Sequence, residues 1–357
     1  MPDHKTNTPN MNTRILSLLT GIGLLASGAH AQLQRIVLQG SGAPQVFTDL
    51  GAAVAAAQDN DKLYFSGGTF TNTGDLILDR PLHFFGAGIS PDSSAVTGVT
   101  TLATTGGETQ ILTAATGSTF TGIRFSNTMQ FGDSAADFSP TGIVFQRCEF
   151  VSYAHLGSGS QSSFDECLFR FRFYGYGGVA LVTRCIFTYG GTATHQPISE
   201  FDTGGLTMDH CTVINGRLSN SPGSTVSNCI FTRTANPPFW QSNDAILTNN
   251  LLSSPVLASN MTPAAESGNV LGVPASEIYV NEADLNFDWT DDIHLQPTCV
   301  GVGMATDGTD VGIYGTNSPF KPGAVPFNPH FRNATIAPAT DVNGDLPVNI
   351  RVAAQTH

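Results

Sequence analysis

The segment V-F-Q-R-C-E-F, residues 144–150, recurs five times further along the chain with the same arrangement of polar and apolar positions. The related stretches are S-F-D-E-C-L-F (163–169), L-V-T-R-C-I-F (181–187), T-M-D-H-C-T-V (207–213), T-V-S-N-C-I-F (225–231) and I-L-T-N-N-L-L (246–252). The fifth position is a cysteine in every copy except the last, which has Asn250. Apolar residues stand three positions before and two positions after this site, and two polar residues directly precede it.

The spacing of these copies predicts the fold. Successive fifth positions are 19, 18, 26, 18 and 21 residues apart, and G-I-R-F (122–125) looks like one more copy upstream. Variable lengths fit coils of parallel strands, about 4.8 Å apart, in which insertions form loops on one face. Apolar positions two residues apart point into the core, and the polar pair predicts a corner. We therefore expect an all-β, single-stranded right-handed parallel β-helix of roughly ten to twelve coils.

The repeated cysteines are expected to form one inward-facing column, made of Cys148, Cys167, Cys185, Cys211 and Cys229. Neighbouring coils place Cα atoms at a distance that a disulfide tolerates, but parallel side chains keep the Cβ atoms further apart than the roughly 3.8 Å that a bridge prefers. Asn250 suits a stacking position, where its amide can bond to neighbouring coils. We expect buried free thiols that act as small apolar residues, with one or two bridges, or a metal site, as the alternatives.

Composition and charge restrict the partners. The chain has 357 residues and a formal net charge of −13, with 40% hydrophobic and only 12% charged residues. An acidic chain is poorly suited to nucleic acid or to an anionic membrane surface, since both require basic patches. No stretch after the N-terminal region is long and apolar enough to span a bilayer, so no integral membrane segment is expected in the mature protein.

The N-terminal region is typical of an export signal. Arg14 precedes the apolar stretch 15–26, and Ala29-His30-Ala31 matches the small-x-small cleavage pattern. We expect residues 1–31 to be a signal peptide, with Met11 as an alternative start. The mature protein would then be secreted, or held at the cell surface or in the periplasm.

Two further stretches carry a resemblance to known proteins. F-T-D-L-G-A-A-V-A-A-A-Q-D-N-D-K-L-Y-F-S-G-G-T-F (47–70) is similar to the capping helix and first strand of parallel β-helices, with Thr48 as the expected helix cap. D-I-H-L-Q-P-T-C-V-G-V-G-M-A-T-D-G-T-D-V-G-I-Y-G-T-N-S-P-F-K-P-G (292–323) is similar to a final coil. With the repeat, residues 40–315 resemble the right-handed parallel β-helix proteins of the pectate-lyase-like group, of the secreted bacterial type. The resemblance indicates fold more than activity.

These observations predict the domain boundaries. We expect an N-terminal cap at 32–60, the parallel β-helix at 61–330 and a C-terminal hairpin or cap at 331–357. Asn343-Gly344 is the expected hairpin turn, and the hairpin is expected to cover the open C-terminal edge.

The segment 165–178, D-E-C-L-F-R-F-R-F-Y-G-Y-G-G, contains the main candidate site. If Cys167, Phe169 and Phe171 face inward, Arg170 and Arg172 point outward from one strand. Arginines beside aromatic rings suit a carbohydrate surface, because rings stack on sugars and guanidinium groups bind carboxylates. The candidate carbohydrate-binding residues are Tyr153, Arg170, Arg172, Tyr174, Tyr176 and Trp240, the last expected on an exposed loop stiffened by prolines. The alternative is that the arginines only pair with nearby acids and that Trp240 only covers the core.

Catalysis and metal binding have weaker candidates. Arg170, Arg172, Glu200 and Asp202 are the candidate catalytic residues, and His195 lies in the same inserted loop. Asp307 and Asp310 are weak candidates for calcium binding; no other metal site or cofactor is expected. The family's enzyme signatures Asn-Thr-Asp, Gly-His-Gly and Arg-Ile-Lys do not occur in the sequence. The leading hypothesis is an exported, non-catalytic β-helix that binds polysaccharide at the cell surface. The alternatives are a polysaccharide lyase or glycoside hydrolase with a non-standard site, and a structural or adhesive surface protein.

Overall fold

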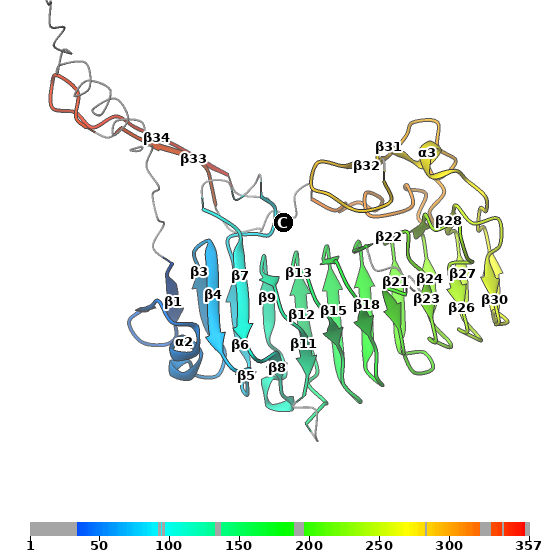
Figure 1. Ribbon diagram of the computed structural model, residues 1–357, viewed down its shortest axis with the longest axis horizontal. Coiled ribbons are helices and arrows are strands. Elements are labelled where there is room, and N and C mark those ends of the chain that lie inside the picture. Colours follow the sequence, from blue (N-terminus) through cyan, green and yellow to red (C-terminus); the bar gives the residue numbers. More distant parts are fainter. Residues whose placement is uncertain are drawn as a thin grey trace, which may run out of the picture. The chain divides into compact units, whose positions relative to one another are not determined.

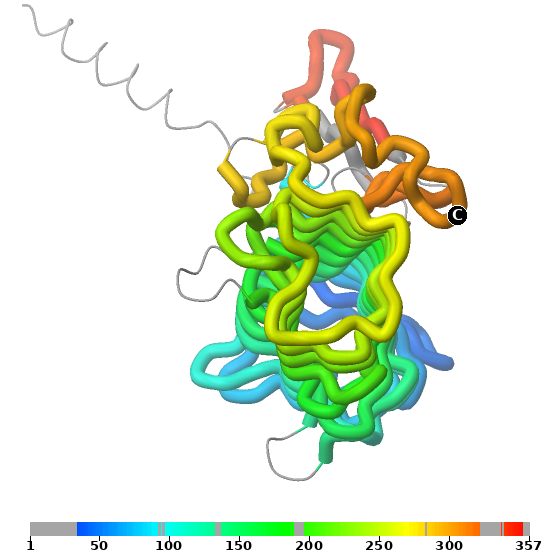
Figure 2. The backbone as a smooth tube through the Cα atoms, turned by 90° about the vertical axis from the view of Figure 1, so that its right-hand side faces the viewer, coloured from blue at the N-terminus to red at the C-terminus, as the bar shows by residue number. Residues whose placement is uncertain are grey.

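The computed structural model describes residues 34–357, except 92–93, 95–96, 133–136, 189–195, 283, 322–329, 338 and 354–357. The predicted signal peptide therefore lies outside the described residues. The described chain is all-β and forms a parallel β-solenoid of about nine turns (Figure 1), which confirms the predicted fold class. Viewed along the stack, successive coils superimpose on one another (Figure 2). Each full coil contributes one strand to each of three sheets.

The three sheets are named A, B and C. Sheet A contains, in spatial order, β2 (Gln45–Phe47), β1 (Ile36–Gln39), β3 (Asp61–Phe65), β6 (Leu82–Phe85), β9 (Thr119–Thr121), β12 (Ile143–Gln146), β15 (Gln161–Asp165), β18 (Val179–Thr183), β21 (Leu206–Asp209), β24 (Thr225–Ser227), β27 (Ile246–Thr248) and β30 (Ala265–Ser267). Sheet B contains β4 (Gly68–Thr73), β7 (Thr100–Thr105), β10 (Arg124–Phe125), β13 (Glu149–Phe150), β16 (Leu168–Phe169), β19 (Ile186–Thr188), β22 (Thr212–Ile214), β25 (Ile230–Phe231) and β28 (Leu251–Leu252). Sheet C contains β5 (Leu76–Leu78), β8 (Thr109–Ile111), β11 (Met129–Phe131), β14 (Ala154–His155), β17 (Phe173–Tyr174), β20 (Ile198–Ser199), β23 (Leu218–Ser219), β26 (Phe239–Trp240) and β29 (Ala258–Ser259).

The core consists of side-chain rows that follow the parallel register. In sheet A, Phe120, Phe145 and Phe164 are aligned by the pairing of β9, β12 and β15. Their rings stack at centroid distances of 4.8 Å and 4.9 Å. Phe125 pairs with Phe150 in sheet B, so G-I-R-F (122–125) is a further copy of the repeat, as predicted. The parallel register therefore brings the inward-facing rings of successive copies into stacking contact at about the strand spacing.

The polar residue directly before the fifth position forms the corner between sheets A and B. It has a left-handed backbone in all six copies, with φ between 49° and 57°: Arg147, Glu166, Arg184, His210, Asn228 and Asn249. This conformation turns the chain within one residue, and a non-glycine residue seldom adopts it. The predicted corner is thus confirmed. The sequence pattern did not indicate that the residue at this corner has a positive φ.

The column positions are filled by free, fully buried thiols. Each thiol of the column up to Cys211 donates to a carbonyl of the preceding coil, for example from Cys185 Sγ to the Phe164 oxygen at 3.4 Å. Asn250 continues the column, because its Oδ1 accepts from the Cys229 amide and its Nδ2 donates to the Val226 oxygen, both at 3.0 Å. Burial raises the pKa of the Cys148 thiol, which favours its protonated form. The thiols therefore act as small core residues.

The parallel coils end at β30 instead of continuing to residue 330, which explains why the structure has about nine turns instead of ten to twelve. Residues 275–321, here called the return segment, do not form the final coil suggested for 292–323. They contain the short helix α3 (Ala275–Ile278) and the antiparallel pair β31 (Tyr279–Asn281) and β32 (Asp292–Leu295). This segment packs on the outer face of sheet B, where outward apolar residues of β16, β19, β22, β25 and β28 form a second core: Leu168, Ile186, Ile214, Ile230 and Leu251.

His210 joins the return segment to a corner of the solenoid. Its side chain is only 2% exposed, and its Nδ1 lies 2.8 Å from Asp209 Oδ2. On the other side of the ring, Nε2 lies 3.4 Å from Thr309 Oγ1. The imidazole is therefore a buried connection between two parts of the chain.

The two ends of the solenoid differ. At the N-terminal end, β1 pairs antiparallel with β2 and β3, and the helix α2 (Leu50–Ala56) buries Leu50, Ala53 and Val54. Its cap is Asp49, whose Oδ1 accepts from the Ala52 amide at 2.7 Å, so the expected cap Thr48 is wrong by one residue. A 3-10 turn, η1 (Thr113–Ala115), lies within the coils.

The predicted C-terminal hairpin consists of β33 (His330–Ile336) and β34 (Val348–Ala353), with Gly344 at φ 86° in the turn. Within the described residues these two strands pair only with each other. The predicted hairpin is thus present, and its covering of the open C-terminal edge stays a prediction. Among the described helices, none has the length and apolar character needed to cross a membrane.

Candidate functional site

The two arginines of the main candidate site, Arg170 and Arg172, have different surroundings. Arg170 follows β16 and Arg172 precedes β17, so a corner separates them and they do not share one strand. Phe173, not Phe171, faces the core and is fully buried. The expectation that Phe169 and Phe171 both face inward is therefore wrong at Phe171, because the chain turns between sheets B and C at this point.

Arg170 belongs to the interface with the return segment. Its Nε donates to Glu149 Oε1, its Nη1 donates to the Phe287 carbonyl at 3.0 Å, and its guanidinium lies 5.8 Å from the centre of the Phe287 ring. Glu149 is 2% exposed and also lies 3.5 Å from Arg124. Arg170 therefore pairs with a nearby acid, as the alternative interpretation expected.

Four other predicted residues lie together on the outer face of sheet C, on neighbouring coils: Tyr153, Arg172, Tyr174 and Tyr176. We call these four residues, together with His155, the tyrosine cluster. The pairing of β14 with β17 aligns His155 with Tyr174 and leaves Ala154 and Phe173 facing the core. The Tyr174 ring lies 6.0 Å from that of Tyr153 and 5.1 Å from that of Tyr176, and both pairs are stacked. Alternation along two paired strands is what brings these side chains together.

Arg172 is positioned within the cluster by Tyr174. Its Nη1 donates to the Tyr174 hydroxyl at 2.5 Å, and its guanidinium carbon lies 5.9 Å from the centre of the same ring. The guanidinium has donors that can bind hydroxyl or carboxyl oxygens. The cluster thus combines ring faces with a cation.

Two features of the Y-G-Y-G-G stretch present Tyr176 to solvent. A Cβ atom on Gly175 would lie 2.5 Å from the Phe201 ring of the next coil, so only glycine fits there. Tyr176 itself has φ 45°, and its side chain is 50% exposed. The glycine permits close packing of the coils, and the left-handed residue directs the ring outward.

His155 is the member of the cluster that the sequence prediction missed. It contacts three tyrosine rings, at centroid distances of 4.9 Å to Tyr153, 5.3 Å to Tyr174 and 5.4 Å to Tyr176. Its Nε2 is buried and has no hydrogen-bond partner among the described residues. A signal for it exists, because His155 and Tyr174 both stand seven positions after a column cysteine.

Burial lowers the pKa of His155 from 6.5 to about 4, so the ring is neutral at neutral pH. We expect a titration of its imidazole NMR signals to give a pKa near this value; a pKa close to 6.5 would contradict the described environment. Because the folded-state pKa is depressed, the unfolded chain binds a proton that the folded chain does not, between about pH 6.5 and pH 4. The stability contributed by neutral His155 is therefore lost as the pH falls through this range, and His155→Gln should reduce that loss in denaturation experiments.

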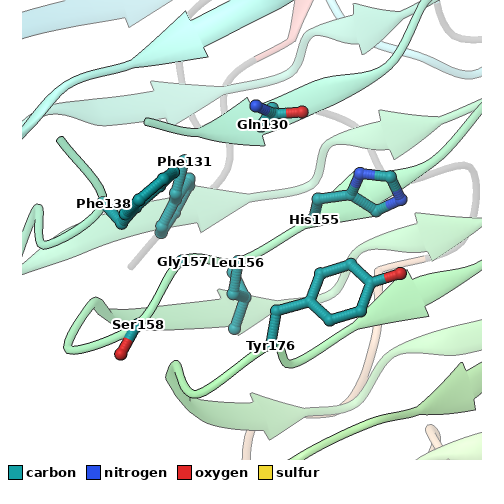
Figure 3. A pocket seen from close by; sticks show the side chains of 8 residues that line it. All are labelled: Gln130, Phe131, Phe138, His155, Leu156, Gly157, Ser158 and Tyr176. Carbon is teal, nitrogen blue, oxygen red and sulfur yellow. The ribbon is translucent and has the colours of Figure 1, made fainter. Parts of the chain in front are cut away.

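A cavity of about 330 Å³ adjoins the cluster (Figure 3). Eight residues line it: Gln130, Phe131, Phe138, His155, Leu156, Gly157, Ser158 and Tyr176. Figure 3 shows Phe131 and Phe138 together on one side and the rings of His155 and Tyr176 on the other. The face therefore includes both a partly exposed aromatic surface and a partly enclosed apolar space.

The candidate acids lie one coil beyond Tyr176. Glu200 and Asp202 follow β20 and are both exposed, while Phe201 between them points into the core. The Tyr176 amide donates to the Glu200 carbonyl at 2.7 Å, and Asn220 Nδ2 donates to Glu200 Oε1 at 2.7 Å. Both acids line a second cavity of about 500 Å³. His195 lies outside the described residues.

Trp240 extends the aromatic surface along sheet C. It belongs to β26 and is half-buried, so it is not on an exposed loop as expected. The strand register aligns it with Tyr174 across two coils that carry the buried residues Ser199 and Ser219. At the usual strand spacing, the three steps from Tyr174 to Trp240 span about 14 Å. Arg217 lies over the indole, with its guanidinium carbon 4.7 Å from the ring centre. A second aromatic and cationic pair is therefore in register with the tyrosine cluster.

The carboxylates suggested for calcium take part in local turns. Asp307 Oδ1 accepts from the amide and hydroxyl of Thr309, at 3.0 Å and 2.7 Å, and Asp310 Oδ1 accepts from the Gly303 amide at 2.9 Å. Within the described ranges, no group of three or more His, Cys, Asp or Glu side chains has an arrangement suited to a metal ion. Calcium binding stays a prediction without a ligand set to support it.

Comparison of the chain with protein-family models, and with curated proteins, gave no match. The candidate site is therefore defined by the geometry of the outer face of sheet C.

Proposed function

We propose that the protein is an exported, non-catalytic β-solenoid that binds polysaccharide through the outer face of sheet C. The observation that carries this proposal is the tyrosine cluster, in which three tyrosine rings and a positioned arginine occupy one outward face of neighbouring coils. Sugar rings present C–H faces that pack on aromatic rings, and their hydroxyl groups need nearby polar partners. The cluster supplies both kinds of contact.

The scaffold supports binding of an extended chain. Parallel pairing holds successive coils in register from β14 to β26, so aromatic side chains are presented on rigid strands. A ligand that contacts Tyr174 and Trp240 together spans several coils, which suits a polymer. Preorganised rings lose little conformational entropy on binding. The net charge of −13 favours neutral or weakly charged polysaccharides over strongly anionic ones, apart from local contacts with Arg172.

The test is a binding assay of the full mature chain with a panel of polysaccharides, among them xylan and glucomannan in acetylated and de-esterified forms. For a polysaccharide that is bound, Tyr174→Ala should weaken binding about 30-fold, which is the effect of removing a central aromatic contact of about 2 kcal/mol. Leu181→Ala is the matched control, because Leu181 is 47% exposed on the outer face of sheet A. Equal affinity of wild type and Tyr174→Ala would refute the choice of face.

An enzyme of the lyase or glycoside hydrolase type is the second candidate, and the position of Glu200 and Asp202 favours it. Both carboxyl groups line a cavity one coil from Tyr176, so a chain bound on the cluster would pass near them. Release of shortened or unsaturated products from the bound polysaccharide, abolished by Glu200→Gln or Asp202→Asn, would replace the non-catalytic proposal. Absence of binding to the whole panel would favour a structural or adhesive role.

A further inference from the structure

Two arginines beside Trp240, here called the arginine pair, have no acidic partner. Arg217 directly precedes β23, and Arg233 follows β25 on the next coil, so both lie in the turns between sheets B and C. Five other arginines each lie within ion-pair distance of a carboxylate: Arg80, Arg124, Arg147, Arg170 and Arg184. Among the described residues, neither member of the arginine pair has such a carboxylate. The positive charge of the pair is therefore not neutralised by the described chain.

The position of the arginine pair is costly for the fold. Arg233 is only 5% exposed, and Arg217 is half-buried. Nη1 of Arg233 lies 3.4 Å from both the carbonyl oxygen and Oδ1 of Asn215, which is long for a hydrogen bond. Burial lowers the pKa of both guanidinium groups, and the charge of Arg217 further lowers the pKa of Arg233. Two cations that lose hydration without a counter-ion destabilise the folded state, and a bound anion would offset this loss.

The terminal nitrogens of Arg217 are the atoms that a ligand can reach. The buried nitrogens without a partner include Nε of both arginines but no terminal nitrogen of either. Nη1 and Nη2 of Arg217 also have no partner among the described residues, so these two nitrogens reach the surface. The guanidinium carbon lies 4.7 Å from the centre of the Trp240 ring, which is itself only half-buried. A ligand that contacts Trp240 on sheet C is therefore close to two available donors.

We propose that the arginine pair binds one oxyanion, a carboxylate or a sulfate ester, which the polysaccharide on sheet C carries at intervals along its chain. Arg217 donates from its terminal nitrogens to the anion, because the guanidinium fork matches two oxygens of such a group. The charge of Arg233 adds to the attraction. The net charge of −13 opposes a polymer with a charge on every sugar, so widely spaced anionic groups fit the protein best. This inference rests on the proposed function, because it assigns a substituent of the same ligand.

The test measures binding of the full mature chain to polysaccharides before and after their charge is removed, at one fixed ionic strength. The probes are glucuronoxylan, with and without reduction of its carboxyl groups to alcohols, and a sparsely sulfated galactan, with and without desulfation. For a polysaccharide that is bound, wild type should bind the charged form about tenfold more tightly, the effect of one charge-assisted hydrogen bond. A preference within the first pair of samples identifies a carboxylate as the anion, and one within the second pair identifies a sulfate ester.

Variants of the arginine pair locate the anion. Arg217→Gln and Arg233→Met should each reduce the preference to about twofold or less, while the affinity for the neutral form stays within about twofold of wild type. Lys62→Gln removes one positive charge from β3 of sheet A and is the matched control that should keep the preference. Arg233→Met should also leave the midpoint of urea unfolding unchanged or raise it, because it removes a buried charge that has no carboxylate beside it. A marked decrease of the midpoint would contradict the argument from the burial of Arg233.

The outcomes separate this inference from the proposed function. Equal binding of the charged and neutral forms of each bound polysaccharide would overturn the assignment of the arginine pair and leave the carbohydrate-binding face intact. A preference that survives in both Arg217→Gln and Arg233→Met would also overturn it, and loss of that preference in Arg172→Gln would place the anion at the tyrosine cluster instead. Binding to no form of either polysaccharide, together with failure of the wider panel, would overturn both proposals.

Discussion

Glu166→Gln should lower the free energy of unfolding by about 3–5 kcal/mol, because it leaves the Arg147 guanidinium buried without its carboxylate. Arg147 is fully buried and Glu166 is 1% exposed. Their contact is bidentate, with Arg147 Nε 3.0 Å from Glu166 Oε2 and Nη2 3.2 Å from Oε1. Urea or guanidinium denaturation of the full mature chain, followed by the fluorescence of Trp240 and Trp289, measures the change.

A double variant shows whether loss of the carboxylate beside the buried guanidinium is the cause. Removing both charges in R147M/E166L should recover most of the loss, because a buried ion pair contributes little net stability beyond that of apolar residues of similar volume. Some loss should remain, since Glu166 Oε2 also accepts from the Lys321 amide of the return segment at 2.8 Å. Both side chains stand at left-handed corner positions, and methionine and leucine meet the same backbone strain as the residues they replace. A double variant no more stable than Glu166→Gln would contradict this explanation.

Phe145→Ala should lower the free energy of unfolding by about 3–5 kcal/mol, the usual effect of deleting a buried phenylalanine ring. The ring stands in the middle of the core row, 4.8 Å from Phe120 and 4.9 Å from Phe164. It also meets the edge of Phe150 at 5.2 Å. Parallel strands on both sides fix the neighbouring rings, so the cavity cannot easily collapse. The same denaturation experiment measures the effect.

Val144→Ala is the matched control for the core row. Val144 is the preceding residue of β12, faces outward and is 37% exposed. Its truncation should change stability by no more than about 0.5 kcal/mol. Equal losses for Phe145→Ala and Val144→Ala would show that the inward and outward sides of sheet A have been assigned incorrectly.

Much of the solenoid could be predicted because the sequence pattern that specifies each coil is short and repeated. The apolar positions around each cysteine select one register, and a slip by one residue would turn every phenylalanine of the row into solvent. The same repetition indicated that Asn250 takes a cysteine position. The left-handed corner was not predicted, because arginine, glutamate and histidine carry no glycine-like signal for positive φ.

The return segment could not be predicted because it breaks the repeat. The stretch 292–323 has the glycine turns and apolar strands of a further coil, yet its described part, up to residue 321, packs against the outer face of sheet B. The reason is found in residues that are distant in sequence from this stretch. Outward-facing apolar residues of sheet B, such as Ile186 and Ile230, are buried by it. Contacts between residues so far apart in the sequence, such as that of Arg170 with the Phe287 carbonyl, leave no local sequence pattern.

The candidate site was predicted in part. Tyr153, Arg172, Tyr174 and Tyr176 lie together, as alternation along the strands required. Arg170 does not join them, because it precedes the corner between sheets B and C and faces the return segment from the outer side of sheet B. His155 was missed although its distance from a column cysteine equals that of Tyr174, and its buried nitrogen becomes evident only from the packing of three rings around it.

The central claim is that polysaccharide lies on the outer face of sheet C, and NMR of tyrosine-labelled protein tests it most directly. During titration with an oligosaccharide of the bound polymer, ring signals of Tyr153, Tyr174 and Tyr176 should shift together and reach saturation. Signals of Tyr64, Tyr279 and Tyr314, which lie on other parts of the described chain, should keep their positions. Shifts confined to this second group, with those of the cluster unchanged at saturation, would contradict the claim.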